Sequence, residues 1–371
     1  MKLVVITHVV HVQKDGAFWG YAPYIREMNI WFKYIDEVVV VAPLEIKKDL
    51  TEIDTFYDCE SISFKQIPNF NFISLKNTFN SVFKLPLIFW RIFWAMYKAD
   101  HIHLRCPGNV GLIGCFAQIF FPNKKKTAKY AGNWDPESKQ PLSYRLQKWI
   151  LSNSFLTRNI QVLVYGDWKN QSKNIKSFFT ATYSENEKQT VLKNNIDEVA
   201  KFIFVGSLVV GKNPLYAIKL VQVLNESGIK ANLDLYGNGI EKNNLENYII
   251  ENKLEEFVFL RGNQEKDVIS QAYKKSHFVL LPSKSEGWPK AIAEGMFWGC
   301  VPIATKISCV PFMLDYGNRG VLLEMSLEKD LIQLTNLIKN NETLMNKSRL
   351  SQEWSQNYTT DFFEKEIKNL L

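Results

Sequence analysis

Short runs of β-branched and other apolar residues alternate with longer amphipathic stretches along the whole chain, and the pattern occurs twice. Runs of this length between polar turns are typical of strands buried on both faces, and the stretches between them suit helical crossovers. The predicted strands are Leu3–Thr7, Glu37–Ala42, Ile62–Ile67, His101–Leu104, Thr127–Ala131 and Gln161–Tyr165 in the first half, and Phe202–Val205, Asn232–Tyr236, Phe257–Leu260, His277–Leu281, Val301–Ala304 and Val321–Leu323 in the second. We therefore predict an α/β protein with two doubly wound, Rossmann-like domains that face a central cleft, with a ligand at the carboxyl ends of the strands.

The stretch Ser184–Gln189 is polar and poor in apolar residues, which indicates a linker. It divides the chain into a first domain over residues 1–185 and a second over residues 186–345. Residues 346–371 are helical in pattern and unusually aromatic for a free tail. We expect them to pack back across the domain junction.

Length and composition agree with two domains, because 371 residues with 46% apolar side chains suffice for two cores. The net charge of +7 is uneven: residues 1–180 carry +9 and residues 181–371 carry −2. The first half therefore favours an acidic partner such as membrane headgroups, a phosphorylated acceptor or nucleic acid, although a solubilising surface fits equally well.

Cysteine usage and the hydrophobic pattern indicate a cytoplasmic protein. The five cysteines are odd in number and contain no CxxC, so neither a disulfide framework nor a zinc site of known spacing is indicated. The apolar run after Lys2 is too short for a secretory signal, and no run reaches the roughly 20 residues of a membrane span.

The most informative segment is Leu280–Met296, which has the pattern of a strand, a loop and a helix. Pro289 suits the first helical position, and Gly287 before it permits close approach to the backbone. The free N–H groups at the start of that helix favour a phosphate. Glu286 at the loop mouth and Glu294 inside the helix would bring one carboxylate to a sugar and the other to a ribose.

This segment resembles the retaining nucleotide-sugar glycosyltransferases of family four, which have the GT-B fold. The shared frame is Pro-Ser…Glu-Gly…Glu-Gly-Met…Gly-Xaa-Pro-Ile, with seven residues between the glutamates, and here it extends from Pro282 to Ile303. The resemblance implies transfer with retention from a nucleoside-diphosphate sugar, UDP-sugar favoured over GDP-sugar. The acceptor would be a hydroxyl of a saccharide or lipid-linked saccharide in surface polysaccharide biosynthesis, with no nucleic acid involved.

The resemblance also implies a donor site. Gly211-Lys212 looks like the end of the family's phosphate loop, whereas Ser207 stands where the family usually has an arginine. Arg261, Lys290 or backbone amides would then supply the missing positive charge. The implied catalytic residues are Glu286 and Lys212, and the implied donor-binding residues are Gly206, Ser207, Lys212, Gly237, Asn238, Gly239, Arg261, Glu286, Gly287, Trp288, Lys290 and Glu294.

The first half matches the family less closely. Its glycines in Asp15–Tyr21 are spaced differently from the family's pair, and Arg105 falls where the family often has a histidine. The expected acceptor-binding residues are Gly16, Trp19, Gly20, His103, Arg105 and Asn133. Because no Asp-Xaa-Asp occurs to bridge a metal to a diphosphate, we expect no essential metal and no cofactor.

Plainer interpretations remain open at the sequence level. Lys290 and Glu294 are spaced for a surface ion pair on a helix, and Lys212 can be a solvated loop lysine. A nucleotide-sugar epimerase of the same architecture and a non-catalytic binding protein are the rival functions. A dinucleotide oxidoreductase is disfavoured because no GxGxxG follows the first strand.

The segment Ser81–Tyr97 indicates a second kind of partner. Aromatic residues are interleaved there with Lys84, Arg91 and Lys98, which recur every seven residues and form one stripe on a helix. This pattern predicts docking on the inner face of the cytoplasmic membrane. An ordinary crossover helix with its aromatics in the core is an equally weighted alternative.

Overall fold

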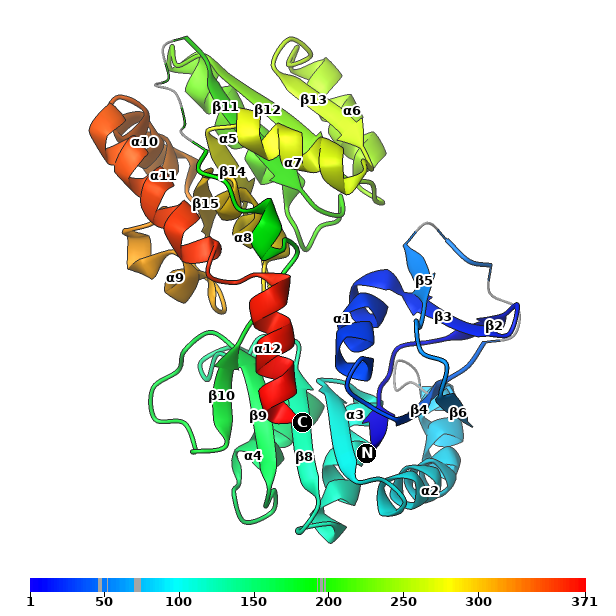
Figure 1. Cartoon of the computed structure of the whole chain (residues 1–371). Helices are drawn as coiled ribbons and strands as arrows, with labels where there is room; N and C mark the ends of the chain where they lie inside the picture. The colour runs from blue at the N-terminus through cyan, green and yellow to red at the C-terminus, as the bar shows by residue number, and fades with distance from the viewer. Residues whose placement is uncertain (46–48, 52, 70–74, 192, 194–195, 197) are drawn as a thin grey trace. The chain divides into compact units, whose positions relative to one another are not determined.

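The computed structural model describes residues 1–45, 49–51, 53–69, 75–191, 193, 196 and 198–371. The chain divides into two compact units, one made of Met1–Phe178 with Glu364–Leu371 and one made of Phe179–Phe363. Each unit contains its own parallel β-sheet (Figure 1). All twelve predicted strands are present within a residue or two of their expected bounds. The predicted fold, two doubly wound Rossmann-like domains, is confirmed.

The first unit is built on a seven-stranded sheet in which every neighbouring pair is parallel. In sheet order the strands are β10 (Ile175–Phe178), β9 (Ile160–Tyr165), β8 (Lys125–Tyr130), β7 (His101–Cys106), β1 (Lys2–Ile6), β4 (Glu37–Pro43) and β6 (Ile62–Ile67).

Helices cover both faces of this sheet. On one face lie α2 (Leu75–Tyr97), α3 (Asn109–Ala117) with the 3-10 turn η1 (Gln118–Phe120), and α4 (Leu142–Ser152), whose inner side chains share one hydrophobic core with the strands. The other face carries α1 (Ala22–Phe32) and the end of α12 (Thr360–Leu370), since Glu27 of α1 bonds to Lys129 of β8 and Glu366 of α12 to Lys176 of β10. β7 therefore sends alternate side chains to two different helical layers.

A small antiparallel sheet in the same unit was not predicted. It consists of β2 (Val12–Lys14), β3 (Ala17–Tyr21) and β5 (Asp54–Phe56). Asp15 and Gly16 join β2 to β3 with φ of 51° and 78°, which is the positive-φ pair that a two-residue hairpin turn requires.

The second unit is built on a six-stranded parallel sheet. In sheet order the strands are β13 (Val258–Gly262), β12 (Ala231–Tyr236), β11 (Ala200–Val205), β14 (Phe278–Leu281), β15 (Val301–Thr305) and β16 (Val321–Leu323). Its helices are α5 (Pro214–Glu226), α6 (Lys242–Glu251), α7 (Lys266–Lys275), α8 (Lys290–Phe297), α9 (Val310–Met313), α10 (Leu327–Ile338), α11 (Asn341–Ser355) and the first residues of α12, with 3-10 turns η2 (Glu185–Glu187) and η3 (Asp315–Gly317).

The expected linker and the expected tail both contain helical secondary structure. Ser184–Gln189 lies inside the second unit, and Ser184 and Glu187 form a capping box around η2. The tail is two helices, α11 and α12, and α12 passes from the second unit into the first at Phe363–Glu364. Among the helices that the structure describes, none has the length and apolar character needed to cross a membrane.

Each sheet has a point where the strand order reverses. In the first unit it lies between β1 and β7, and in the second between β11 and β14. Loops that leave neighbouring strands in opposite directions open a crevice at the carboxyl ends of such strands, which is where doubly wound proteins bind ligands.

Candidate functional site

Two predicted catalytic residues meet across the reversal point of the second unit. Lys212 follows β11 and Glu286 follows β14, and Lys212 Nζ lies 2.6 Å from Glu286 Oε1. The Glu286 side chain is only 7% exposed, so this ion pair lies largely out of water on the carboxylate side. The main chains are joined at the same place, where Lys284 N–H donates to Gly211 O at 2.8 Å.

Glycines allow two neighbouring loops, after β11 and after β12, to stack at this edge. A Cβ added to Gly237, after β12, would lie 2.0 Å from Gly206 O, and one at Gly239 would lie 2.2 Å from Leu208 O. Leu208 N–H donates to Asn238 O at 3.0 Å, so the backbone of one loop rests directly on the next. Any larger residue at Gly237 or Gly239 would force the phosphate-loop candidate away from β12.

The helix after the Glu286 loop starts one residue later than expected. Pro289 is the N-cap, because its ψ of 89° is not helical, and Lys290 is the first helical residue. Gly287 O accepts a hydrogen bond from Cys309 Sγ at 3.0 Å and from Ser308 Oγ at 3.3 Å, which anchors the loop that carries Glu286. The amino end of α8 therefore presents backbone N–H groups beside a fixed loop, a favourable setting for an anion.

Glu294 lies on α8, partly buried, and accepts a hydrogen bond from Thr182 Oγ1 at 2.7 Å. Removal from water raises the pKa of its carboxyl, and the bond from Thr182 and the charge of Lys290 oppose that rise only in part. The partnership with Thr182 was not predicted, because nothing in the local sequence links residues 112 positions apart.

The position of the expected arginine is occupied by exposed Ser207. Arg261 Nε donates to Asp234 Oδ1 at 2.6 Å, and its guanidinium lies 4.6 Å from the centre of the Phe259 ring. Arg261 is therefore held at the β12–β13 side of the sheet by its ion pair with Asp234. Lys290 is the first residue of α8, the helix that directly follows the Glu286 loop. Of the two alternative cations, Lys290 is the one placed with the Glu286 loop.

Ser283 adds a polar group that the sequence did not single out as a binding residue. It lies two residues after the end of β14, is 1% exposed, and its Oγ has no hydrogen-bond partner among the residues that the structure describes. Buried hydroxyls are ordinarily bonded, so this oxygen remains available to a bound molecule or water.

The expected acceptor residues of the first unit fall in separate places. Gly16 is in the β2–β3 turn with open space around its Cβ position, while Trp19 and Gly20 lie on β3. Trp19 packs on Phe56 with ring centres 5.0 Å apart, and Gly20 packs against His11. This group belongs to the small antiparallel sheet.

His103 and Arg105 lie on β7 and face α1. His103 is fully buried, its Nδ1 lies 2.9 Å from Thr127 Oγ1, and burial lowers its pKa. Glu27 Oε1 accepts from Arg105 at 2.5 Å, and Glu27 Oε2 accepts from Lys129 at 2.8 Å. Burial opposes ionisation of Glu27, but these two cations more than offset it and hold its pKa well below the usual range.

Asn133 follows β8, and its side chain shapes its own loop. Asn133 Oδ1 accepts from Asp135 N–H at 2.9 Å, and its main-chain oxygen accepts from Gln140 Nε2. The six expected acceptor residues are therefore divided among a hairpin, the α1-facing side of β7 and the loop after β8, and the structure does not bring them together.

His8 lies at the reversal point of the first unit. It follows β1 and is accessible to solvent, and a Cβ at Gly108, after β7, would lie 2.8 Å from His8 Nδ1. Desolvation and the charge of Arg105 lower the pKa of His8, so its imidazole is biased toward the neutral, proton-accepting form.

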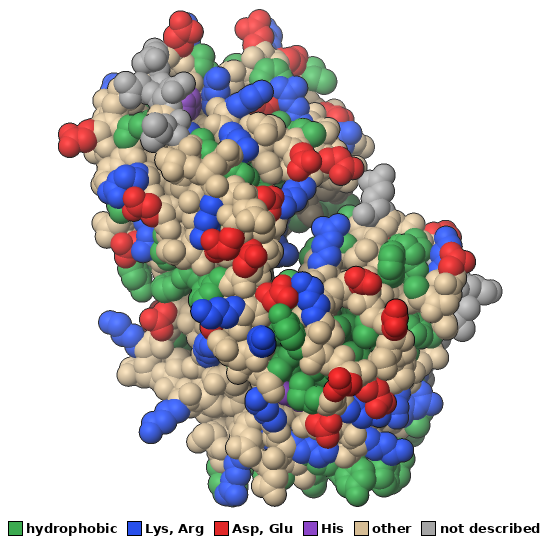
Figure 2. Space-filling view, in the orientation of Figure 1, with side chains coloured by type: hydrophobic (Ala, Val, Ile, Leu, Met, Phe, Trp, Pro, Cys, Tyr) green, Lys and Arg blue, Asp and Glu red, His purple; other side chains and the backbone are tan. Residues whose placement is uncertain are grey.

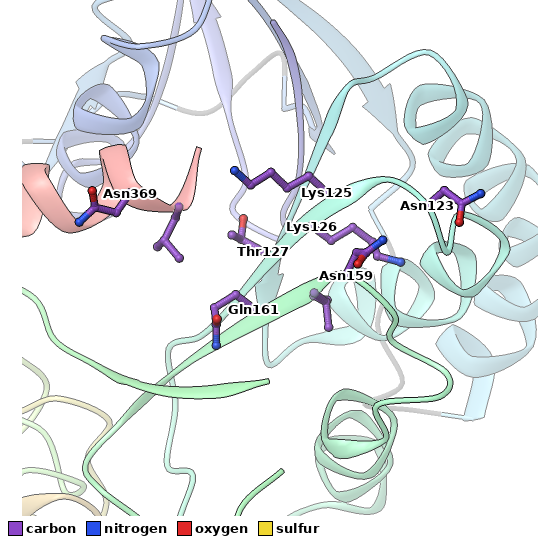
Figure 3. A pocket seen from close by; sticks show the side chains of 9 residues that line it. Asn123, Lys125, Lys126, Thr127, Asn159, Gln161 and Asn369 are labelled. Atoms are coloured by element: carbon purple, nitrogen blue, oxygen red, sulfur yellow. The ribbon is translucent and has the colours of Figure 1, made fainter. Parts of the chain in front are cut away.

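A cavity of about 420 Å³ in the first unit lies at the opposite strand ends (Figure 3). Lys125 and Ile160, the first residues of β8 and β9, line it together with Asn369 of α12. Because ligands of doubly wound domains bind at the carboxyl ends of strands, this cavity is not where an acceptor is expected.

Within the described residues, no group of three or more His, Cys, Asp or Glu side chains could hold a metal ion. The expectation that the reaction needs no metal concerns the reaction itself and stays a prediction.

Comparison with known proteins agrees with the geometry of the second unit. Residues 184–358 match the family model described as glycosyl transferases group 1. An uncharacterized glycosyltransferase of Haemophilus influenzae is 29% identical over 170 residues, covering 45% of this chain and 47% of the relative. One of Methanocaldococcus jannaschii is 27% identical over 158 residues, covering 42% and 43%. The chain thus covers less than half of the length of either relative.

Solved structures match over the entire chain. Sucrose-phosphate synthase from Thermosynechococcus elongatus superposes with a TM-score of 0.69 at 14% identity, covering 100% of this chain and 98% of the other. The lipopolysaccharide outer core galactosyltransferase WaaB gives 0.68 at 16% identity, covering 100% and 99%. Anabaena HepE in complex with UDP gives 0.67 at 14% identity, covering 100% and 99%. At these identities the likeness shows the shared GT-B architecture.

Proposed function

We propose that this protein is a retaining glycosyltransferase that moves a sugar from a nucleoside-diphosphate sugar, UDP-sugar favoured, to a hydroxyl of a saccharide or lipid-linked saccharide. The observation that carries the proposal is the Lys212–Glu286 pair at the reversal point of the sheet, within the residues that match the glycosyl transferases group 1 model. The UDP bound by HepE and the lipopolysaccharide core named for WaaB support the choice of donor and of a surface polysaccharide as the product.

Each group has a distinct task in this reaction. Lys212, the amides at the start of α8 and Lys290 would meet the negative charge of the diphosphate, which grows as the glycosidic bond breaks. Glu286 would orient the sugar, and Glu294 would accept hydrogen bonds from the ribose. The acceptor hydroxyl would enter on the face that the diphosphate leaves, while the charged groups stay fixed.

The ion pair sets a condition on donor binding. Lys212 already neutralises Glu286 at 2.6 Å, so a diphosphate must share this lysine with the carboxylate. Removing the charge of Glu286 therefore frees Lys212 for phosphate and removes only the contact to the sugar. Loss of Lys212 acts on the phosphate directly.

The test compares Glu286→Gln with Lys212→Met after a panel of UDP-, GDP- and ADP-sugars has identified the donor. Glu286→Gln should lower turnover by about 100-fold or more, as removal of a preorganised polar contact commonly does, and should retain UDP binding. Lys212→Met should weaken UDP binding. Lys284→Met, which changes an exposed lysine on the loop that carries Glu286, is the matched control and should retain both properties.

Three outcomes would reject the proposal. Full turnover of Glu286→Gln at saturating donor would remove Glu286 from the reaction. Release of free, epimerised sugar nucleotide without transfer would identify the epimerase of the same architecture, and saturable binding without turnover would identify a binding protein.

A further inference from the structure

The outer surface of the α2, α3 and α4 layer of the first unit is apolar where a solvent-facing helical layer is ordinarily polar. We call this surface the aromatic face. Its members are exposed large apolar side chains: Phe83, Leu87, Trp90, Trp94 and Tyr97 of α2, Phe116 of α3, Phe120 of η1, Leu142, Leu146 and Trp149 of α4, and Phe155.

Spacing shows that the α2 members share one side of the helix. They recur at alternate intervals of four and three residues from Phe83 to Tyr97, which returns to the same side about every two turns. The opposite side of α2 carries Ile88, Ile92 and Met96, which are fully buried in the core. α2 is therefore apolar on both sides, although only one is needed for folding.

Ring contacts make the surface continuous beyond α2. Trp94 lies 5.4 Å from both Trp90 and Tyr97 between ring centres, and Phe93 lies 5.9 Å from Phe120 of η1. α3 packs against α2 on one side and α4 on the other, so the three helices form one layer. In Figure 2, apolar side chains lie at the lower margin near the region where Figure 1 labels α2, with Lys and Arg side chains beside them.

Exposure of these rings is substantial. The exposed fraction is 69% for Phe83, 57% for Trp90 and 59% for Trp149, and 72% for Phe155. Contiguous apolar surface of this kind on a soluble domain indicates a partner.

The positive charge around the aromatic face indicates that the partner is anionic. α2, α3 and α4 contain no Asp or Glu, and residues 83–158 hold twelve Lys and Arg against three Asp and Glu. The other residues of 1–180 hold eleven of each sign, so the whole basic excess of the first half lies in this segment. Arg105, Lys126 and Lys129 are buried, and the other nine cations are at least partly exposed.

The cations of α2 stand beside the aromatic face. Lys84, Arg91 and Lys98 directly follow Phe83, Trp90 and Tyr97 in the sequence. Lys84 donates to Asn69 O at 3.2 Å and Arg91 to Gln66 O, so these bonds hold the side chains without cancelling their charge. The aromatic face thus has a positive border.

We infer that the aromatic face docks on an anionic lipid surface, with Trp and Tyr rings at the headgroup level and the Lys and Arg border on the phosphates. Aromatic rings flanked by cations suit this interface, where one end of a ring is apolar and the other wet. A second copy of the chain is the poorer partner, because it would bring like charges together. This inference does not depend on glycosyl transfer.

The test is cosedimentation of the full chain with phosphatidylcholine vesicles that contain or lack phosphatidylglycerol, at low and high salt. Wild-type protein should bind only the anionic vesicles and should bind less at high salt. A Trp90→Ser, Trp94→Ser, Tyr97→Ser triple variant should lower partitioning by more than about tenfold, since each ring leaves the membrane interface. A Lys84→Gln, Arg91→Gln, Lys98→Gln triple variant should lower it by about fivefold for each charge.

Matched control variants test whether vesicle binding depends on the aromatic face or on exposed apolar and basic residues anywhere in the protein. Ile250→Ser with Ile332→Ser removes exposed apolar groups of the second unit, and Lys230→Gln, Lys253→Gln, Lys275→Gln removes three exposed cations there. Both should bind vesicles like the wild type. Circular dichroism and a UDP thermal shift, which report the fold and the second unit, should be the same for every variant.

Failure of the wild type to bind anionic vesicles at low salt would overturn the inference, as would equal binding by either triple variant of α2. Concentration-dependent dimerisation that the aromatic variant abolishes, without vesicle binding, would identify the face as a contact between copies of the chain and would equally overturn it.

Discussion

Glu294 lies partly buried on α8 with Thr182 as its hydrogen-bond donor, and desolvation raises the pKa of its carboxyl. A raised pKa means that the folded state favours the protonated form, so this stabilisation is present at low pH and is lost as the pH rises through the raised pKa. At neutral pH the charged Glu294 carboxylate therefore lowers the stability of the folded protein. A role in ligand binding would explain why such a residue is kept.

Glu294→Gln should raise the midpoint of thermal unfolding at pH 7 and weaken UDP binding, because glutamine keeps an acceptor for Thr182 and loses the charge. The advantage over wild type should shrink as the pH falls toward the acid range. Glu246→Gln, an exposed glutamate on α6, is the control and should change neither property. A lower unfolding midpoint for Glu294→Gln at pH 7 would contradict this prediction, because it would mean that the charged Glu294 carboxylate stabilises the folded protein.

At the scale of elements, Glu27 ties α1 to two strands through Arg105 of β7 and Lys129 of β8. Lys129 is fully buried and the other two side chains nearly so, and removing one partner of such a cluster leaves uncompensated charge. Glu27→Gln should therefore lower the free energy of unfolding by about 3–5 kcal/mol, measured by urea denaturation at pH 7.

The same cluster predicts a direction for acid sensitivity. Because the pKa of Glu27 is depressed in the folded state, its stabilisation is present above the unfolded-state value of about 4.3 and is lost as the pH falls toward the folded-state value. Wild-type stability should thus fall more steeply below about pH 4 than that of Glu27→Gln. Glu60→Gln, an exposed site in the same unit, should follow the wild-type curve.

The strands were predictable from the sequence and the side-chain partnerships were not. Val38–Val41 is fully or almost fully buried within a parallel sheet, and burial on both faces requires the continuous apolar run that periodicity detects. The β2 strand, Val12-Gln13-Lys14, has only one buried side chain, so the Asp15-Gly16 turn was the only strong hairpin signal. Glu27 and Lys129 are 102 positions apart, and no local pattern reports a contact of that span.

The candidate donor site shows the same division. Lys212 follows β11 and Glu286 follows β14, the two strands on either side of the point where the strand order of the sheet reverses. The loops after two such strands lie close together, so the two side chains meet. The expected acceptor residues do not share such a position in the fold. Gly16 lies in the β2–β3 turn, whereas His103 lies within β7, with its ring centre 4.5 Å from that of Trp31. The candidate donor site could be predicted from sequence because the sheet topology brings the loops after β11 and β14 close together in space.

At the scale of the whole molecule, charge and candidate chemistry are separated. The basic excess lies in residues 83–158 of the first unit, whereas residues 181–371, which hold the candidate donor site, carry −2. A nucleotide sugar with a diphosphate thus gains little from the overall field of the second half. In the proposed reaction, its charge would be met by local groups, namely Lys212, Lys290 and the amino end of α8.

This leads to a prediction for metal removal, made on the intact protein because transfer requires donor and acceptor together. If two lysines and the helix end supply the positive charge that a divalent ion supplies elsewhere, EDTA should change the transfer rate by less than about twofold. Lys212→Met should remain slow when Mg²⁺ or Mn²⁺ is added, since the described residues place no cluster of three or more His, Cys, Asp or Glu side chains that could hold the ion in place of the lysine. A parallel assay with EDTA and excess Mg²⁺ controls for the chelator itself. Transfer that vanishes with EDTA and returns with Mg²⁺ or Mn²⁺ would mean that the diphosphate carries its own metal into the site, and that Lys212 serves chiefly to hold Glu286 in position.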